Sequence, residues 1–298
     1  MLILTLVLQE IDHASRLDTW RETAEQTLRA SGAEVGSCRI LGDGEALDLE
    51  LTHVDRRRAL EAMRAATNGQ PIDLCLQESE GRRKRLLVAD MESTVIENEM
   101  LDELAQLVGA GEKVAAITAR AMNGELDFRE ALRERVGLLA GLEATVLEQC
   151  REHVRIDSGS AVLVSTLRAA GIKTALVSGG FLSFAQPVAD ALGFDHAQAN
   201  RLEIEEGRLT GRVIEPILDR DAKVQALDRL CDQYGLQRSD AVTIGDGAND
   251  LAMLGAAGLG VAYHGKPIVA EAAPQRINVG DLSTLLYFLG YPRESWRA

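Results

Sequence analysis

Paired cysteines, internal repeats and low-complexity segments are absent from this 298-residue sequence, which has only four cysteines and six prolines. The cysteines lie far apart, and none belongs to a Cys-x-x-Cys pair with a histidine partner, so neither a zinc site nor a disulfide framework is indicated. The composition, 46% hydrophobic and 26% charged, excludes fibrous and wholly disordered architectures. We therefore expect a folded chain with buried free thiols at Cys38, Cys75, Cys150 and Cys231.

Long hydrophobic runs are also missing, because no stretch approaches the roughly 18 apolar residues that a membrane-spanning helix needs. The apolar opening MLILTLVL has no basic segment before it and meets Glu10 and Asp12 at once. It is too short for a signal peptide with a cleavage site, so it predicts a strand. These absences predict a cytoplasmic protein with no membrane-spanning segment.

Positive charge is scarce: 32 Lys and Arg residues face 46 Asp and Glu residues, giving a net charge of −14 and a pI near 4.9. Nucleic acids and anionic membranes are recognised by clustered cations, so this balance argues against both as partners. An anionic substrate would have to be bound by local groups. We interpret the one basic run, Arg82-Arg83-Lys84-Arg85, as a solvated linker edge, with a docking patch as the alternative.

The length of the chain favours two domains. Residues 1–81 follow the order strand, helix, strand, strand, helix, strand, with a Gly42-Asp43-Gly44 turn between the middle strands. That order predicts a small ferredoxin-like α+β (βαββαβ) domain. Its expected elements are a strand at 1–8, a helix at 17–30, strands at 34–41 and 46–51, a helix at 56–67 and a strand at 72–77.

Residues 82–298 have a different sequence pattern, in which short apolar strands alternate with helical stretches. Such strands are typical of parallel sheets that are buried on both faces, so we predict an α/β, doubly wound, Rossmann-like core. Residues of purely helical pattern, approximately 97–155, are inserted after the first strand and are expected to form a cap over the carboxyl edge of the sheet. The expected strands are 86–89, 173–177, 241–244 and 258–262, and the expected helices include 161–170, 184–192 and 223–234.

The residues that end these strands are candidates for a site, because open α/β sheets bind ligands beyond the carboxyl ends of their strands. The first strand runs into Asp90 and Glu92, of which one carboxylate could act as nucleophile and the other as general acid and base. The third strand runs into Asp246, followed by Asn249 and Asp250. Carboxylate oxygens are the ligands that a hard cation such as Mg²⁺ needs.

Two more motifs belong to the same edge. Ser178-Gly179-Gly180 follows the second strand, where a hydroxyl and backbone N–H groups can approach phosphate oxygens. Lys223 begins a helix and could pair with a phosphate as a point charge. Structural alternatives remain for single residues: Ser178 as a helix cap, Lys223 as a solvated residue, Asp250 at a helix N-terminus. The ordered set of four motifs favours one shared site.

Together these motifs resemble the haloacid dehalogenase superfamily of aspartyl-phosphate enzymes, and within it the phosphoserine phosphatases. The resemblance covers roughly residues 83–292 and includes the insertion. Residues 1–81 resemble the amino-acid-sensing ACT modules, which implies an amino-acid effector and a homodimer formed through the sheets. The positions that carry the first resemblance are 90–94, Glu99, 121–124, Phe128, 133–136, 178–180, Lys223 and 245–250.

The resemblance implies Mg²⁺-dependent hydrolysis of O-phospho-L-serine through an aspartyl phosphate on Asp90, the final step of serine biosynthesis. It places Mg²⁺ on Asp90, the backbone carbonyl of Glu92 and Asp246, with Asp250 orienting these groups. Lys223 and the metal would neutralise the phosphoryl oxygens in the transition state. Phosphate binding would be completed by Ser178, Gly179, Gly180 and Asn249.

Recognition of the amino acid is assigned to the insertion, since phosphoserine carries an ammonium and a carboxylate beside its phosphate. Glu99 suits the ammonium and Arg135 suits the carboxylate. Met122 and Phe128 would form an apolar wall that closes over the site and excludes water. The structural alternatives are a place in the core of the cap for Met122 and Phe128, and a surface ion pair for Arg135.

One position departs from the family pattern, because Glu92 stands where the family has Asp. The carboxylate is kept, but its extra methylene shifts the reacting group, and a displacement of about 1 Å can cost on the order of a hundredfold in rate. Three hypotheses follow: a working phosphatase with an adapted loop, a slowed enzyme that transfers the phosphoryl group to another acceptor, or a weakly active regulatory protein. Two rivals stay open beside them, a serine sensor and an enzyme for another small phosphomonoester.

Overall fold

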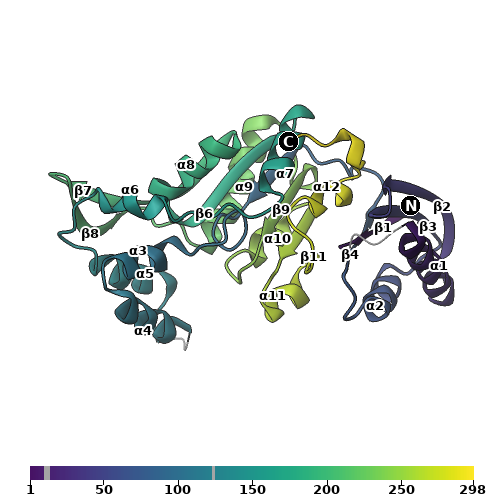
Figure 1. Cartoon of the computed structure of the whole chain (residues 1–298), viewed down its shortest axis with the longest axis horizontal. Coiled ribbons are helices and arrows are strands. Elements are labelled where there is room, and N and C mark those ends of the chain that lie inside the picture. Colours follow the sequence, from purple (N-terminus) through teal and green to yellow (C-terminus); the bar gives the residue numbers. More distant parts are fainter. Residues whose placement is uncertain (10–13, 123–124) are drawn as a thin grey trace.

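The computed structural model describes residues 1–9, 14–122 and 125–298, and the side chains of residues 14, 15 and 122 are left out. Its strands form one eleven-stranded sheet in the order β2-β3-β1-β4-β11-β10-β9-β5-β6-β7-β8. Figure 1 shows the N-terminal unit at the right end of this sheet and the helices of the insertion at the left. Among the described residues, no helix combines the length and the apolar character that a membrane crossing requires.

The N-terminal unit has the predicted βαββαβ order. Along its first strand, Leu2, Leu4, Leu6 and Leu8 lie on one face and are buried beneath the two helices, whereas Thr5 and Val7 lie on the opposite face, which is also buried. The second helix begins after Asp55, whose side chain accepts a hydrogen bond from the Arg58 N–H. The elements are β1 (Leu2–Leu8), α1 (Ala14–Ala30), β2 (Glu34–Gly42), β3 (Ala46–Thr52), α2 (Arg56–Ala66) and β4 (Ile72–Glu78).

The second part of the chain confirms the doubly wound core. Five strands pair in parallel in the order β10-β9-β5-β6-β7, with β11 parallel to β10 at one end. Helices pack on both sides, and the described core residues of this part fall into two apolar clusters. The strands are β5 (Leu86–Ala89), β6 (Lys173–Phe181), β7 (His196–Glu205), β8 (Arg208–Ile214), β9 (Ala241–Gly245), β10 (Leu259–Tyr263) and β11 (Gln275–Ile277).

The helices of the core are α7 (Ser160–Ala169), α8 (Leu182–Leu192), α9 (Arg220–Tyr234), α10 (Leu251–Ala256), α11 (Pro267–Ala272) and α12 (Thr284–Phe288), with short 3₁₀ turns at Arg238–Asp240 and Arg293–Ser295. The insertion is helical, as expected, and contains α3 (Met100–Leu107), α4 (Gly111–Met122), α5 (Phe128–Gly137) and α6 (Val146–Arg151). A reciprocal capping box between Asp127 and Glu130 fixes the start of α5.

The two parts of the chain are joined through the sheet and through a C-terminal helix. Strand β11 pairs antiparallel with β4, and the Gln275 side-chain amide both donates to and accepts from the backbone of Leu76. On the face of the N-terminal sheet away from α1 and α2, Val7, Ala46 and Cys75 belong to the same apolar cluster as α12. Residues of the second part of the chain therefore cover the second face of the N-terminal sheet.

The interpretation of the basic run as a solvated linker edge was wrong. Arg82 and Lys84 are buried, whereas Arg83 and Arg85 alternate outward. The Arg82 guanidinium donates to both carboxylate oxygens of Asp48, at 2.5 and 2.8 Å, and to the carbonyls of Tyr287 and Phe288. A residue of the run is thus the buried cation that ties the N-terminal sheet to the C-terminal helix. The expectation of four buried thiols also fails at Cys38, which is exposed on edge strand β2; all four cysteines are free.

Replacing Arg82 should strongly destabilise the protein. Arg82→Ala leaves the Asp48 carboxylate buried without its cation, which costs about 3–5 kcal/mol in comparable pairs. Chemical denaturation of the full chain measures this loss in the free energy of unfolding. The exposed neighbour provides a matched control, since Arg85→Ala should change stability by no more than about 0.5 kcal/mol. Equal, small losses of stability in the two variants would show that Arg82 does not tie the N-terminal sheet to the C-terminal helix.

Candidate active site

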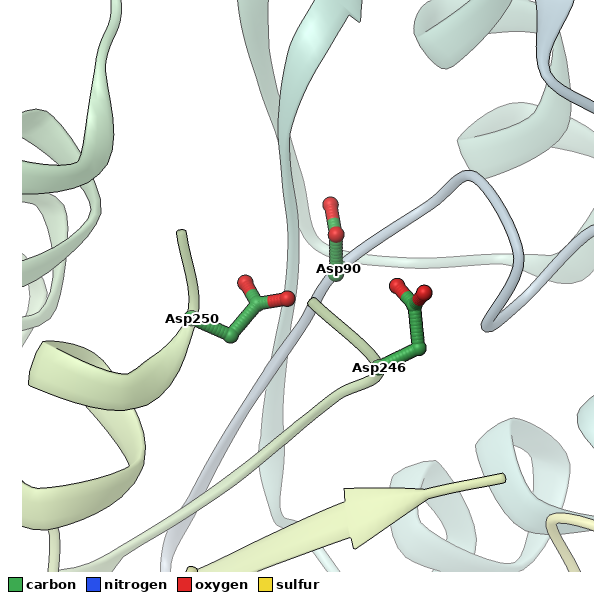
Figure 2. Close-up of side chains that lie close together, drawn as sticks. All are labelled: Asp90, Asp246 and Asp250. Atoms are coloured by element: carbon green, nitrogen blue, oxygen red, sulfur yellow. The ribbon is translucent and has the colours of Figure 1, made fainter. Parts of the chain in front are cut away.

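Three aspartates meet at the carboxyl edge of the parallel strands. Asp90 follows β5, Asp246 follows β9, and Asp250 precedes α10. The Asp90 N–H donates to the carbonyl of Ile244 in the neighbouring strand, which fixes where the chain leaves the sheet. One carboxylate oxygen of each aspartate lies within 4.8 Å of the others, and Figure 2 shows the three side chains side by side.

Lys223 lies among these carboxylates, buried near the start of α9. Its Nζ is 2.8 Å from Asp90 Oδ1 and 2.6 Å from Asp250 Oδ1. Burial opposes the charge of Lys223, but the two aspartates outweigh it and raise the pKa of the lysine. The helix begins at this point because Asp219 caps it, accepting from the N–H groups of Asp221 and Ala222. The alternative of a solvated lysine is excluded by this burial.

Asp250 is held by both of its carboxylate oxygens. Oδ1 contacts Lys223, and Oδ2 accepts from the Gly247 N–H at 3.0 Å. Gly245 permits this approach, because a methyl group there would lie 2.5 Å from the Asp250 carboxyl carbon. Burial and the charge of Asp90 raise the pKa of Asp250 to about 7. Since both oxygens already have partners, Asp250 orients Lys223.

The side chain of Asp246 is half-buried, whereas those of Asp90 and Asp250 are buried, so Asp246 has the most accessible carboxylate of the three. Burial, followed by the charges of Asp90 and Glu99, raises its pKa to about 7, while Lys266 and Lys223 act in the opposite direction. Carboxylates crowded to this degree favour a bound proton or a bound cation. The acidic cluster is therefore suited to a divalent metal ion.

Glu92 reaches the same site by way of the helical insertion. Its Oε1 accepts from the Met100 N–H at the start of α3, at 2.9 Å. Its carboxylate also lies against Gly180, where an added methyl group would come within 2.7 Å of Glu92 Oε2. Burial, and then the charges of Glu99 and Asp90, raise the pKa of Glu92 to about 8. The longer side chain is thus held at a defined position by α3 and the Gly180 loop.

The loop after β6 presents a hydroxyl and backbone N–H groups to the site. Buried Ser178 accepts from the Gly180 N–H through Oγ, at 2.9 Å, which leaves the hydroxyl proton free to donate. The Asn200 side chain steadies this loop by donating to the Gly179 carbonyl at 2.8 Å. The N-cap of α8 is Phe181, so capping is not the role of Ser178.

A cavity of about 270 Å³ connects these groups with the insertion. Glu99 lies in the wall of the cavity, and its carboxylate accepts a hydrogen bond from Ser93 Oγ at 2.8 Å. Burial raises the pKa of Glu99, and the charge of Asp90 raises it further, whereas the hydrogen bond from Ser93 acts in the opposite direction. Phe128 faces Gly179 across the opening. Of the predicted site residues, the cavity wall contains Asp90, Glu92, Glu99, Phe128, Arg135, Gly179, Gly180, Asp246 and Asn249.

Arg135 projects into this cavity from α5 without an ion pair to any of the described residues. Its Nε donates to the Ala131 carbonyl at 3.3 Å, and burial lowers the pKa of its guanidinium. The surface-pair alternative for Arg135 is therefore wrong, because the side chain turns inward and keeps donors unused. Met122 ends α4, but its side chain is outside the described residues, so its predicted place in the apolar wall stays a prediction.

Sequence reasoning missed Asp102, Leu132 and Lys266, which also line the cavity. Lys266 follows β10, so the rule that found Asp90 and Asp246 would have found it if applied to the fourth strand. Asp102 lies three residues after Glu99 in α3, on the same side of the helix. Ion pairs from Arg129 to Asp219 and from Arg133 to Glu215 link α5 to the core beside the site.

The fold and the site together consist of a doubly wound sheet with an aspartate cluster and a buried lysine at its carboxyl edge, covered by a helical insertion. The family model of haloacid dehalogenase-like hydrolases matches residues 87–255. The chain belongs to this family.

Several similar proteins carry the name phosphoserine phosphatase. The chain is 46% identical over 241 residues to a phosphoserine phosphatase of Streptomyces coelicolor, covering 81% of this chain and 59% of that one. It is 47% identical over 204 residues to a phosphoserine phosphatase of Haemophilus influenzae, and the match covers 68% of this chain and 65% of that one. It thus spans less than two thirds of the length of either relative. The crystal structure of a probable phosphoserine phosphatase from Vibrio cholerae matches 99% of this chain and 88% of its own, with a TM-score of 0.77 and 31% identity.

Proposed function

We propose that the protein hydrolyses O-phospho-L-serine to serine and phosphate in a Mg²⁺-dependent reaction through a phosphorylated Asp90. The observation that carries this proposal is one cavity whose wall contains Asp90 and Asp246 together with Glu99 and an inward-turned Arg135. Lys223 contacts Asp90 from behind this wall. The names of the relatives support the same substrate.

Asp90 has the contacts that a nucleophile needs. Oδ1 is held by Lys223 and by the Met91 N–H at 2.8 Å, which leaves Oδ2 to attack the phosphorus. The new bond forms to Asp90 as the bond to the serine oxygen breaks, and the leaving oxygen takes a proton from Glu92. Lys223 and the Ser178 hydroxyl balance charge on the phosphoryl oxygens. Water then attacks the phosphorus of the acyl phosphate, Glu92 recovers a proton from that water, and Asp90 is regenerated.

The acidic cluster fits Mg²⁺, because Asp90 and Asp246 each offer carboxylate oxygens, and the charge of Asp90 is among the causes that raise the pKa of Asp246. The Glu92 backbone carbonyl would be the third protein ligand. When bound, the ion would offset the negative charge of the phosphoryl group, so that an anionic nucleophile can approach it. Asp250 contributes through Lys223, since its own oxygens are occupied.

The other end of the cavity matches an amino acid. Arg135 offers guanidinium donors that pair with a carboxylate, and Glu99 offers an anion for the ammonium. Phe128 closes the side of the cavity against the Gly179 loop. Removing water from this volume strengthens both ion pairs and protects the acyl phosphate from unproductive attack.

Substituting Arg135 tests the assignment of the substrate. Arg135→Ala should lower kcat/KM for O-phospho-L-serine at least about 30-fold, equivalent to roughly 2 kcal/mol, because the substrate carboxylate loses its buried partner. Activity toward O-phosphoethanolamine, which has no carboxylate, should change little. Steady-state kinetics with both substrates measure the two ratios.

The neighbouring Arg133 supplies the control for this experiment. It lies on the same helix but forms an exposed ion pair with Glu215, so Arg133→Ala should leave the preference between the two substrates intact. If Arg135→Ala leaves that preference unchanged as well, the cavity does not recognise the carboxylate, and phosphoserine is the wrong substrate.

A further inference from the structure

A second cavity, of about 200 Å³, lies away from the catalytic site, where the end of α2 meets the junction between β4 and β11. These elements are labelled in Figure 1. The N-terminal unit contributes one side of the cavity and the catalytic half contributes the other. Its polar lining includes Arg64, Thr67, Gln70, Asp73, Arg276 and Asn278.

Two arginines line this cavity from opposite sides, and among the described residues neither is paired with a carboxylate. Arg64 comes from α2 and Arg276 from β11, and neither makes an ion pair or a side-chain hydrogen bond with the rest of the described chain. The Arg64 Nε is buried and has no acceptor within the part of the chain that the structure describes. Burial lowers the pKa of Arg64, and the charge of Arg276 adds to this effect. A buried donor without an acceptor is costly, and two like charges add to that cost.

The acidic residue in the cavity wall, Asp73, is already satisfied by other groups. Its carboxylate accepts from the N–H groups of Asn278, Val279 and Gly280, and from the side chain of Gln9. It therefore offers no free lone-pair direction for pairing with Arg64 or Arg276. That two cations stay unpaired in a chain of net charge −14 is the unusual feature of this cavity.

We propose that this cavity binds a small oxyanion, held between the guanidinium groups of Arg64 and Arg276. Guanidinium groups suit the oxygens of a phosphate or a carboxylate, because their N–H donors match two oxygens at once. The anion would give the Arg64 Nε its missing acceptor and would offset the repulsion between the arginines. The side-chain amides of Gln70 and Asn278 provide additional donors at the rim. Inorganic phosphate and the carboxylate of a free amino acid are the two sources of this chemistry.

Calorimetric titration of the full chain, in chloride buffer with EDTA, tests the site. Inorganic phosphate and L-serine are titrated separately into the unmodified protein, Arg64→Gln and Arg276→Gln. At least one probe should bind the unmodified protein, and both variants should weaken that binding tenfold or more. Phosphate that enters the catalytic cavity contributes equally to all three proteins, so the difference isolates the second cavity. The probe that responds identifies the source of the anion.

Arg58→Gln is the matched control, because Arg58 lies on the same helix and is exposed, and its loss changes the net charge equally. It should bind both probes as the unmodified protein does. Thermal unfolding without added phosphate or serine checks the fold: removing one of two facing cations should leave the Tm of Arg276→Gln at or above that of the unmodified protein. The proposal is overturned if the arginine variants and Arg58→Gln bind both probes alike, or if neither probe binds the unmodified chain.

Discussion

Asp90→Asn should abolish phosphate release from O-phospho-L-serine, with turnover falling by at least about 10⁴-fold. An amide oxygen is a poor nucleophile, and removal of a covalent nucleophile typically costs several powers of ten in rate. The substitution keeps the size of the side chain, so the cavity and its contact with Lys223 remain sterically possible. Steady-state phosphate release by the full chain with saturating Mg²⁺ measures the effect.

A carboxylate outside the cavity serves as the control. Glu97 is exposed and pairs with Arg155, so Glu97→Gln should retain turnover within about twofold, as expected for a surface substitution. Retention of more than a small fraction of activity by Asp90→Asn would show that another group attacks the phosphorus. Asp90 would then not be the nucleophile.

Glu92→Gln should lower turnover by about 10² to 10⁴-fold, the usual contribution of a positioned general acid and base. The pKa of Glu92 in the metal-free chain is raised to about 8, so its carboxyl group is mostly protonated at neutral pH. A general acid is lost as the pH rises through its pKa, so the unmodified enzyme should slow at alkaline pH, as Glu92 loses its proton. That alkaline fall should be absent from the pH profile of the residual activity of Glu92→Gln.

The shorter carboxylate at the same position separates two accounts of Glu92. Because the Met100 N–H and the Gly180 loop hold the longer side chain, Glu92→Asp should lower turnover, on the order of a hundredfold for a displacement near 1 Å. KM should stay near that of the unmodified enzyme, because proton transfer by Glu92 stabilises the transition state and not the bound substrate. A steep rise in turnover would mean that Glu92 is misplaced in this chain and that slow hydrolysis or phosphotransfer is its native behaviour.

Much of the fold follows from local patterns, because the central strand of the parallel sheet and the first strand of the antiparallel sheet differ visibly in sequence. Leu86–Ala89 is uniformly apolar, and Leu2–Leu8 alternates leucine with other residues. The hairpin β7–β8 was missed because its outer half is rich in exposed charged residues, including Glu205 and Arg208, and resembles a loop. Strand β11 has three residues and pairs across the two parts of the chain, a long-range contact that no local pattern shows.

The basic run illustrates the same limit. Four consecutive cations predict solvent exposure, yet the alternation of a strand-like segment turns Arg82 and Lys84 inward, where Asp48 and the Ser239 carbonyl accept their hydrogen bonds. The partners lie 34 and 155 residues away. Burial of a charge depends on such distant partners, so composition alone could not reveal it.

The site was more predictable than its surroundings, because parallel strands bring their carboxyl ends to one edge whatever the details of the helices. That rule correctly brought Asp90, Asp246 and Asp250 together around Lys223. It could not show that Arg135 has no ion pair among the described residues, or that Gly180 limits the space for Glu92. These are properties of packing between the insertion and the core.

Rapid-quench analysis of the unmodified chain with ³²P-labelled O-phospho-L-serine tests whether the phosphoryl group passes through Asp90. With Mg²⁺, label should appear transiently on a peptide containing Asp90 and then be released as inorganic phosphate. Without Mg²⁺ and with EDTA, both signals should be lost. Release of phosphate with no label on Asp90 at any time point would contradict the covalent route, and no release at all would contradict the proposed activity.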